Sequence, residues 1–261
     1  MKTTIIKTTE GKLSRRRFFI LFAMTATAFL IIFGFLRFCR VKAVTVLNNQ
    51  AVDSATILEK ANVKINKHLF SVNIAKIEKN ILQTSPYIKS VQAKRNLPSE
   101  ILIEVEEYKA DFCVQILDKY YLVSDTLLVL EEISESEAAA HPSALLTLPE
   151  INTDEGKFGI GKKIVFIDRE KGNFVSEILK TVTSSFLSDS LTSLSLHEEA
   201  NITAVANNRY TLRLGNKKDL EKKIAMCEEA IAYLRDNMPS VTGTLFAWST
   251  KQVTFEITGA N

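Results

Sequence analysis

The sequence predicts an α+β protein that a single N-terminal helix holds at a membrane. Three observations predict this fold class. Residues 18–38 form a long apolar stretch, short segments rich in β-branched residues follow it between turn signals, and two later segments repeat apolar residues at helical spacing. Because most strand-like segments come in neighbouring pairs, we expect the second half to be a mixed α/β domain with a mainly antiparallel sheet.

The apolar stretch, FFILFAMTATAFLIIFGFLRF, has no charged residue from Phe18 to Leu36. A helix that rises about 1.5 Å per residue covers roughly 28 Å over this length, which is close to the thickness of a bilayer's hydrocarbon core. A helix also satisfies its own backbone groups, as lipid requires. Residues 18–38 are therefore predicted to be a transmembrane helix.

Charge predicts the orientation of this helix. Residues 1–17 carry six Lys or Arg and one Glu, a net charge of 6 − 1 = +5, whereas the whole chain is +3 and the remainder is therefore 3 − 5 = −2. Positive charge gathers on the cytoplasmic side of membrane helices. We expect a single-pass protein of the cell (inner) membrane, with a basic cytoplasmic tail at residues 1–17 and a periplasmic or extracytoplasmic bulk.

A cleaved signal peptide is the alternative interpretation of the N-terminus. Its apolar region would be shorter, about 7–15 residues, with small residues at the cleavage site. Here Ala26 and Ala28 form the only Ala-x-Ala pair of the stretch and lie inside it, and the exit is bulky. The sequence therefore favours an anchor.

Residues 39–108 are predicted to fold in the order β-α-α-β-β. Asn48-Asn49 and Ser85-Pro86 are turn and helix-stop signals, and isoleucines at helical spacing follow Asn73. The expected elements are a strand at 44–47, a helix that Asp53 or Ser54 caps, a helix that Asn73 caps, and strands at 89–95 and 101–106 joined by a turn at 96–99.

This module resembles a POTRA domain, and its place directly after one membrane helix resembles the bacterial cell-division family FtsQ/DivIB. The residues that carry the resemblance are Val41-x-x-Val44-x-Val46-x-Asn48, Leu69–Val72, Ser85–Val91, Lys94–Ile101 and Glu106–Ala110. Tyr108 departs from the family, which usually has a basic residue there. The resemblance covers the chain from Phe18 to about Leu130 well and the rest weakly.

Residues 109–257 are predicted to form the second, mixed domain, and residues 258–261 a short C-terminal tail. Five apolar residues step by four and three along the clearest amphipathic helix: Leu220, Ile224, Cys227, Ile231 and Leu234. The other expected elements are strands at 113–117, 120–123, 127–130, 190–196, 209–214, 244–249 and 251–257, a loop or short helix at 131–142, and a helix with Phe174, Ile178, Val182 and Phe186 on one face. The order is similar to the family, but Leu127 replaces a usual Gly and Ala247–Ser249 replaces an Asp-Leu-Arg type segment.

A constellation that could carry catalysis is not evident in the sequence. His68, His141 and His197 lack metal-ligand spacing, and there is no Gly-x-Ser-x-Gly or phosphate-binding loop. Asp168 and Glu170 could pair for acid–base work, but neighbouring carboxylates are commoner on a surface turn. We therefore predict no enzyme activity and no catalytic residue, cofactor or metal. Of the three cysteines, Cys113 and Cys227 are expected to be buried free thiols, with a Cys113–Cys227 disulfide as the alternative.

Binding through a sheet edge is the remaining interpretation. A small sheet can accept a strand from a partner at an exposed edge, and the last strand, Lys251 to Ile257, is the best candidate. Val253, Phe255 and Ile257 would face the core, and Phe246 and Trp248 would supply an aromatic anchor or be buried. The predicted partner-binding residues are Phe246, Trp248, Lys251, Gln252, Val253, Thr254, Phe255, Glu256 and Ile257.

The resemblance implies a non-catalytic divisome scaffold at the division site. It would recruit partners resembling FtsB and FtsL, and also the septal synthase complex, and help to position septal peptidoglycan synthesis. Neither a nucleic acid partner nor a small-molecule substrate is expected. A membrane-tethered cell-envelope enzyme of the wall-hydrolase type and a POTRA-bearing transport or assembly factor are the alternatives. POTRA-bearing transport and assembly factors continue into a transmembrane barrel. The remaining residues of this chain contain two long amphipathic helices, which a barrel cannot use.

Overall fold

The computed structural model describes residues 15–260, and the chain divides into two compact units. The first unit holds residues 15–49, 53–81 and 91–105, and the second holds the remaining described residues. Residues 1–14 of the basic tail that was predicted at residues 1–17 lie outside the described residues. The predicted domain boundary between residues 108 and 109 stays a prediction.

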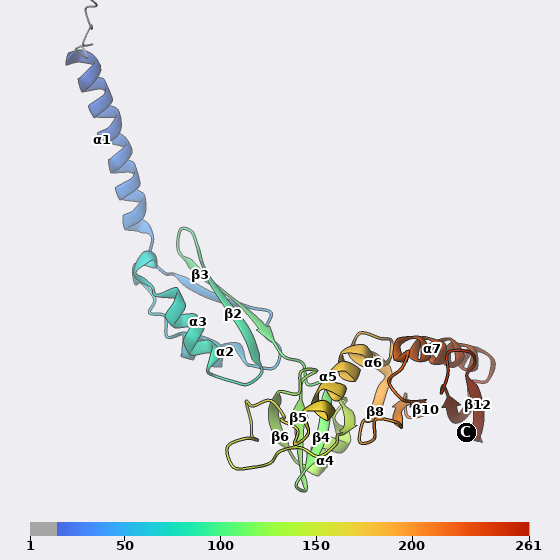
Figure 1. Ribbon diagram of the computed structural model, residues 1–261. Coiled ribbons are helices and arrows are strands. Elements are labelled where there is room, and N and C mark those ends of the chain that lie inside the picture. Colours follow the sequence, from blue (N-terminus) through green and yellow to red (C-terminus); the bar gives the residue numbers. More distant parts are fainter. Residues whose placement is uncertain (1–14, 261) are drawn as a thin grey trace, which may run out of the picture. The chain divides into compact units, whose positions relative to one another are not determined.

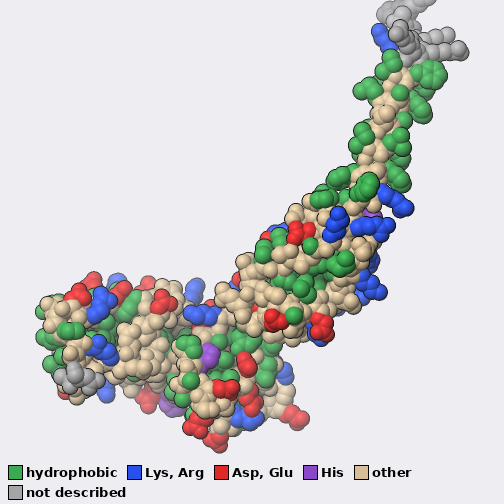
Figure 2. Space-filling model, turned by 180° about the vertical axis from the view of Figure 1, so that it is seen from behind, with side chains coloured by type: hydrophobic (Ala, Val, Ile, Leu, Met, Phe, Trp, Pro, Cys, Tyr) green, Lys and Arg blue, Asp and Glu red, His purple; other side chains and the backbone are tan. Residues whose placement is uncertain are grey.

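The helix α1, Arg15–Phe38, contains the predicted membrane segment and begins three residues earlier than expected. The length of this helix (Figure 1) and its apolar composition between Arg17 and Phe35 suit a membrane span. Its apolar side chains are exposed along the helix (Figure 2). Thr25 and Thr27 donate their hydroxyls to backbone carbonyls of the preceding turn. These polar side chains therefore do not need partners from outside the helix.

The first folded module has the predicted β-α-α-β-β order, with one short 3-10 turn added. Its three-stranded sheet has the order β1-β3-β2, and β1 and β3 are parallel. Asp53 caps α2 and Asn73 caps α3, as two of the predicted signals indicated. The elements are β1 Ala43–Leu47, α2 Ser54–Ala61, η1 Leu69–Ser71, α3 Ile74–Leu82, β2 Ile88–Asn96 and β3 Glu100–Glu107.

Packing of this module follows the apolar spacing. Ile77 and Ile81 of α3 are buried, and so are Ile101 and Ile103 on one face of β3. The helices therefore cover one face of the small sheet, as Figure 1 shows. The side chain of Glu107, at the end of β3, accepts hydrogen bonds from the backbone N–H groups of residues 50, 51 and 52 at 2.6–3.1 Å.

The second unit is built on one nine-stranded sheet with the order β12-β11-β10-β9-β8-β7-β4-β5-β6. Five neighbouring pairs are antiparallel and three are parallel, so the prediction of a mainly antiparallel mixed sheet is confirmed. The strands are β4 Phe112–Ile116, β5 Lys119–Val123, β6 Val129–Ile133, β7 Ala144–Thr147, β8 Leu191–Ser195, β9 Ile202–Ala206, β10 Tyr210–Gly215, β11 Val241–Phe246 and β12 Thr254–Ala260.

Helices α5 and α7 contribute to the main core of this unit. All five predicted apolar residues of α7 are buried against the sheet, and Phe174, Ile178 and Val182 of α5 are buried too. Phe186 lies beyond the end of α5, so its predicted place on that helix is wrong: Ser184 closes the helix first. The helices are α4 Glu135–Ala140, α5 Arg169–Thr183, α6 Leu187–Ser190 and α7 Leu220–Asn237.

The turn at Leu127 keeps a conformation that usually needs glycine. Leu127 has a φ of 59°, in the left-handed region, and its side chain is buried in the core. Burial of the apolar side chain offsets the backbone strain. The predicted strand at 127–130 is shifted, because Leu127 closes the turn that begins at Ser124 and Leu128 forms only an isolated bridge to Lys163, so that β6 runs from Val129 to Ile133.

The three described cysteines are free and buried. Burial raises the pKa of the Cys227 thiol to about 12 and also raises that of Cys113. The interpretation as buried free thiols is therefore confirmed, and these groups behave as small apolar side chains.

Candidate partner-binding edge

Strand β12 lies at one end of the nine-stranded sheet and pairs only with β11. The prediction that the last strand forms an edge is thus confirmed. Its bounds are different: β12 runs from Thr254 to Ala260, so Lys251, Gln252 and Val253 precede the strand. The predicted tail at 258–261 is wrong for residues 258–260, because Thr242 and Val241 of β11 pair with Gly259 and Ala260.

The orientation of the β12 backbone follows from the hydrogen bonds of β11. The N–H groups of Gly243 and Ala247 donate to carbonyls of Arg209 and Arg213, so alternate residues of β11 point toward β10. The residues between them, including Thr244, point toward β12, where Thr244 faces Glu256. Phe255 and Ile257 alternate with Glu256 and therefore direct their N–H and C=O groups away from β11, to the free edge.

Gly243 allows β12 to pack closely on β11. A Cβ atom at this position would overlap the carbonyl oxygen of Glu256 and lie 2.6 Å from the ring of Phe255. The Phe255 ring therefore occupies the space over the glycine, and it meets the ring of Tyr210 edge-on with centroids 6.4 Å apart. This contact fixes the inner face of β12 to the core.

Ile257 does not face the core as predicted, since 58% of it is exposed. Its partner in β11 is Gly243, which offers no side chain, and Phe255 already covers that glycine. Val253 and Phe255 are half-buried and pack on the core, as predicted. Ile257 is therefore an apolar side chain at the free edge rather than a core residue.

The predicted aromatic pair lies just before this edge. Phe246 is half-buried, whereas Trp248 is 66% exposed, so Trp248 is not a core residue. Their rings meet edge-on with centroids 5.2 Å apart, and the guanidinium of Arg213 lies 5.7 Å from the centre of the Phe246 ring. This contact holds the aromatic pair on the sheet face opposite Leu245 and Ala247, which are fully buried.

The loop from Ala247 to Val253 replaces the predicted tight pair of strands. Ala247 stays bonded to β10, and the indole of Trp248 lies against Gly215, where an added Cβ would be 3.5 Å from the ring. Gly215 has a φ of 68° at a register shift of β10. The strand β11 therefore ends at Phe246, and the polar residues after Trp248 form a turn.

Together, the predicted residues form one surface at the C-terminal edge. Gln252, Thr254 and Glu256 are exposed, as expected, and so is Lys251. Sequence reasoning missed Arg213, Gly215 and Gly243. A glycine within a strand pattern is the available signal for close backbone approach, and Gly243 shows it. No sequence pattern indicated a role for Arg213, because its contact with Phe246 depends on the parallel pairing of β10 with β11.

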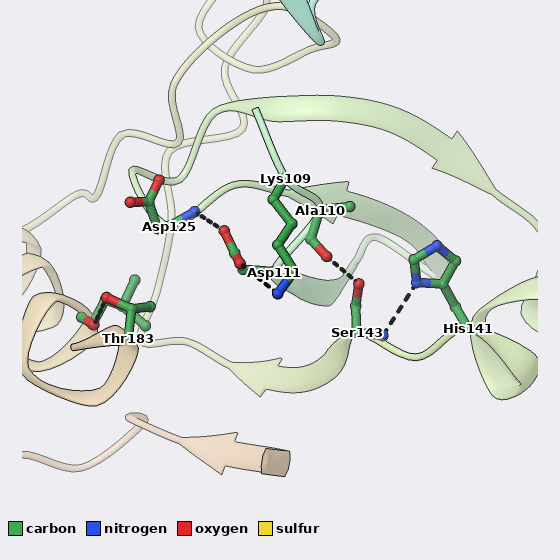
Figure 3. Close-up of polar contacts among 8 residues, drawn as sticks. Lys109, Ala110, Asp111, Asp125, His141, Ser143 and Thr183 are labelled. Carbon is green, nitrogen blue, oxygen red and sulfur yellow. Dashed lines mark hydrogen bonds and ion pairs between the residues drawn. The ribbon is translucent and has the colours of Figure 1, made fainter. Parts of the chain in front are cut away.

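A polar cluster around Asp111 tests the alternative of an enzyme (Figure 3). Asp111 accepts a hydrogen bond from the Asp125 backbone N–H at 3.0 Å, and the Lys109 ammonium lies 3.9 Å from its other oxygen. Burial raises the pKa of Asp111. The carboxylate therefore holds a turn of the second unit, an ordinary structural role for a half-buried Asp.

Ser143 and His141 in the same cluster are also bonded to the backbone. The Ser143 hydroxyl donates to the Ala110 carbonyl, and His141 Nδ1 accepts from the Ser143 backbone N–H at 3.2 Å (Figure 3). The hydroxyl is thus directed at a carbonyl rather than at the imidazole. A nucleophile activated by a base needs the opposite arrangement.

The carboxylate pair at Asp168 and Glu170 has a local explanation. Asp168 Oδ1 accepts a hydrogen bond from the Glu170 backbone N–H at 2.8 Å and is the N-cap of α5. Both side chains are exposed. Within residues 15–260, no group of three or more His, Cys, Asp or Glu could hold a metal ion.

Comparison with known proteins supports the interpretation of the first module. The family described as "POTRA domain, FtsQ-type" matches residues 39–108. The chain is similar to cell division protein DivIB of Clostridium tetani, with 22% identity over 72% of this chain and 68% of the relative. It is also similar to DivIB of Clostridium acetobutylicum, with 31% identity over 48% of each chain.

A third relative is cell division protein FtsQ of Rickettsia bellii, 31% identical over 33% of this chain and 32% of the relative. The matched domain begins directly after the apolar helix α1, which fits a membrane anchor. Its β-α-α-β-β order and the mixed sheet beyond it agree with the fold expected from the resemblance. Residues 39–108 therefore form a POTRA domain of the FtsQ type, and the chain is similar to the FtsQ and DivIB cell division proteins.

Proposed function

We propose that this protein is a non-catalytic scaffold of the divisome that captures a partner by adding the partner's strand to β12. The observation that carries the proposal is the free edge of β12, where Phe255 and Ile257 direct backbone groups outward beside the exposed Trp248. Backbone hydrogen bonds along an edge supply affinity, and a neighbouring aromatic side chain supplies an anchor.

The proposed partners resemble FtsB and FtsL, and through them the scaffold helps to position septal peptidoglycan synthesis. This assignment rests on the family and on the predicted site residues, which the fold gathers at one edge. The backbone bonds held by Asp111, Ser143 and Asp168 favour a scaffold over a wall hydrolase, because they engage the polar groups that catalysis would use.

The proposed orientation places the N-terminus in the cytoplasm and both folded units outside, at the division site. The basic residues before α1 support this orientation. Fusions to the C-terminus report it directly: alkaline phosphatase should be active there, and a fluorescent protein that folds only in the cytoplasm should be dark. The reverse pattern would overturn the orientation.

A proline substitution tests strand capture. Ile257→Pro removes an N–H group that points to the free edge, and most of the side chain that it replaces is exposed. Proline is tolerated on an edge strand at such a position. We expect Ile257→Pro to keep the thermal midpoint of the full-length protein within about 3 °C, which corresponds to a change below about 1 kcal/mol, and to lose co-purification of FtsB- and FtsL-like proteins.

Two variants control for this experiment. Ile257→Ala keeps the N–H group and should retain the partners, whereas Glu256→Pro removes a donor that faces β11 and should release β12. If Ile257→Pro co-purifies its partners at the wild-type level, strand addition at β12 is wrong.

A further inference from the structure

Three segments of the first unit meet where the chain leaves α1. The Leu69 N–H donates to the Cys39 carbonyl and the Val41 N–H donates to the Lys67 carbonyl, both at 2.9 Å. The Lys42 N–H donates to the Ser99 carbonyl at 2.7 Å. Residues 39–42, 64–70 and 97–99 therefore form one surface, called here the membrane-proximal face.

This face is positively charged. Arg40, Lys42, Lys64 and Lys67 are all exposed, and Arg40 is fixed by a 2.9 Å hydrogen bond from its guanidinium to the Asn66 carbonyl. The sequence has no Asp or Glu from residue 37 to residue 52 or from residue 60 to residue 77. Figure 2 shows Lys and Arg side chains gathered where α1 joins the folded part of this unit.

Large apolar side chains are interleaved with these charges. Ile65 lies between Lys64 and Lys67 and is 53% exposed, and Leu97 at the β2–β3 turn is 52% exposed. Phe70 is exposed at the end of the same loop. Basic residues beside exposed apolar residues are typical of surfaces that lie in the headgroup region of a bilayer, where the charge meets phosphate and the apolar tip enters the acyl boundary.

A shallow pocket beside the loop has the chemistry to hold a phosphate group. Its volume is about 160 Å³, and Lys64, Lys67 and Lys76 line it together with asparagines and apolar residues. None of its lining residues carries a carboxylate. An anion that enters it therefore meets several ammonium groups without an opposing charge.

Chain connectivity keeps this face at the membrane surface. Helix α1 ends at Phe38, and two residues later Arg40 forms an isolated antiparallel β-bridge with His68. Two residues reach at most about 7 Å, so residues 64–70 stay near the end of the helix whatever angle the helix makes with the bilayer. We propose that the membrane-proximal face binds the anionic phospholipid headgroups of the bilayer that α1 spans, an inference that rests on the proposed membrane insertion of α1.

The test uses the full-length protein in nanodiscs of neutral phosphatidylcholine, with or without about 30% phosphatidylglycerol. An Ile65→Cys variant carries an environment-sensitive dye, which labels this position selectively because the native cysteines are buried. We expect the dye emission to shift to the blue in the anionic discs. Each basic residue near an anionic surface contributes about a fivefold change in affinity, so adding Lys64→Gln and Lys67→Gln should weaken docking by roughly 25-fold and remove the shift.

The matched control adds Lys157→Gln and Lys171→Gln, two exposed lysines of the second unit, and should keep the shift. Equal dye emission in neutral and anionic discs would overturn the inference while leaving α1 inserted. A shift caused by inorganic phosphate in neutral discs but not by phosphatidylglycerol would also overturn it, because the face would then bind free phosphate. A chain that enters neither disc would overturn the membrane anchor and this inference together.

Discussion

Gly243 is the residue on which the position of β12 depends most directly. Because Gly243 has no side chain, the Phe255 ring and the Glu256 carbonyl fit beside it, and β12 can pair closely with β11. The signal for this role was present in the sequence as a glycine within a strand pattern. Its partner residues were not evident, because they depend on the register between two strands.

We predict that Gly243→Ala loosens β12. Overpacking at a close contact costs about 1–3 kcal/mol, and here the added methyl group displaces backbone and ring atoms of β12. Hydrogen exchange of residues 254–260 should become faster than in the wild type, and partner binding should weaken. Thr244→Ala, one position along the strand, should leave both unchanged; unchanged exchange in Gly243→Ala would contradict this role.

Lys223 holds the turn that leads from β10 into α7. It is buried, and its ammonium donates to the Leu214 and Asn216 carbonyls at 2.9 Å each. Lys223→Met would leave these acceptors without a donor, so we predict a loss of about 1–3 kcal/mol in the free energy of unfolding. Lys222→Met, on the exposed side of α7, should change it by less than about 0.5 kcal/mol.

The contribution of Lys223 to the stability of the folded chain should change with pH in one direction. Burial lowers the pKa of Lys223 below its usual value, so the unfolded chain binds more protons than the folded chain between the two pKa values. The contribution of Lys223 to stability should therefore increase as the pH rises through its folded pKa toward 10.5. Urea unfolding of the wild type and of Lys223→Met at several pH values measures this contribution. If the difference in the free energy of unfolding between the two proteins shrinks with rising pH, the pKa of Lys223 is not lowered in the folded chain.

Helix α7 and strand β12 show which elements the sequence could predict. The stripe of α7 is a local pattern, and all five of its predicted residues are buried. The ends of β11 and β12 were misplaced, because they depend on the close contact at Gly243, on the register shift beside it, and on the bond from Ala247 to β10. The parallel pairing of β10 and β11, which α7 connects, was not predicted either, since it joins strands far apart in the chain.

The aromatic pair offers a direct report on β12. Trp248 is the only tryptophan of the chain, and it is largely exposed. A partner strand on β12 should bury it, so we predict that its fluorescence shifts to the blue and that acrylamide quenches it less. Ile257→Pro should abolish both changes in the presence of the partner. Partner binding by the wild-type chain with an unchanged emission spectrum would place the contact elsewhere.

Taken as a whole, the molecule places its two candidate contacts in different units. The basic and apolar membrane-proximal face follows α1 directly, whereas the β12 edge lies at the end of the second unit. The fold class, the anchor helix and the first module were predictable, because they rest on composition and on short motifs. The nine-strand order was not predictable, since it is set by contacts distant in sequence.

Strand capture by β12 can be tested in living cells by measuring the length of cells that are depleted of the native protein and express either Ile257→Pro or Ile257→Ala. If β12 captures a division partner, Ile257→Ala should restore normal length and Ile257→Pro, at equal membrane abundance, should leave long unseptated filaments. Cells of normal length with Ile257→Pro would show that the free edge of β12 does not recruit the division machinery.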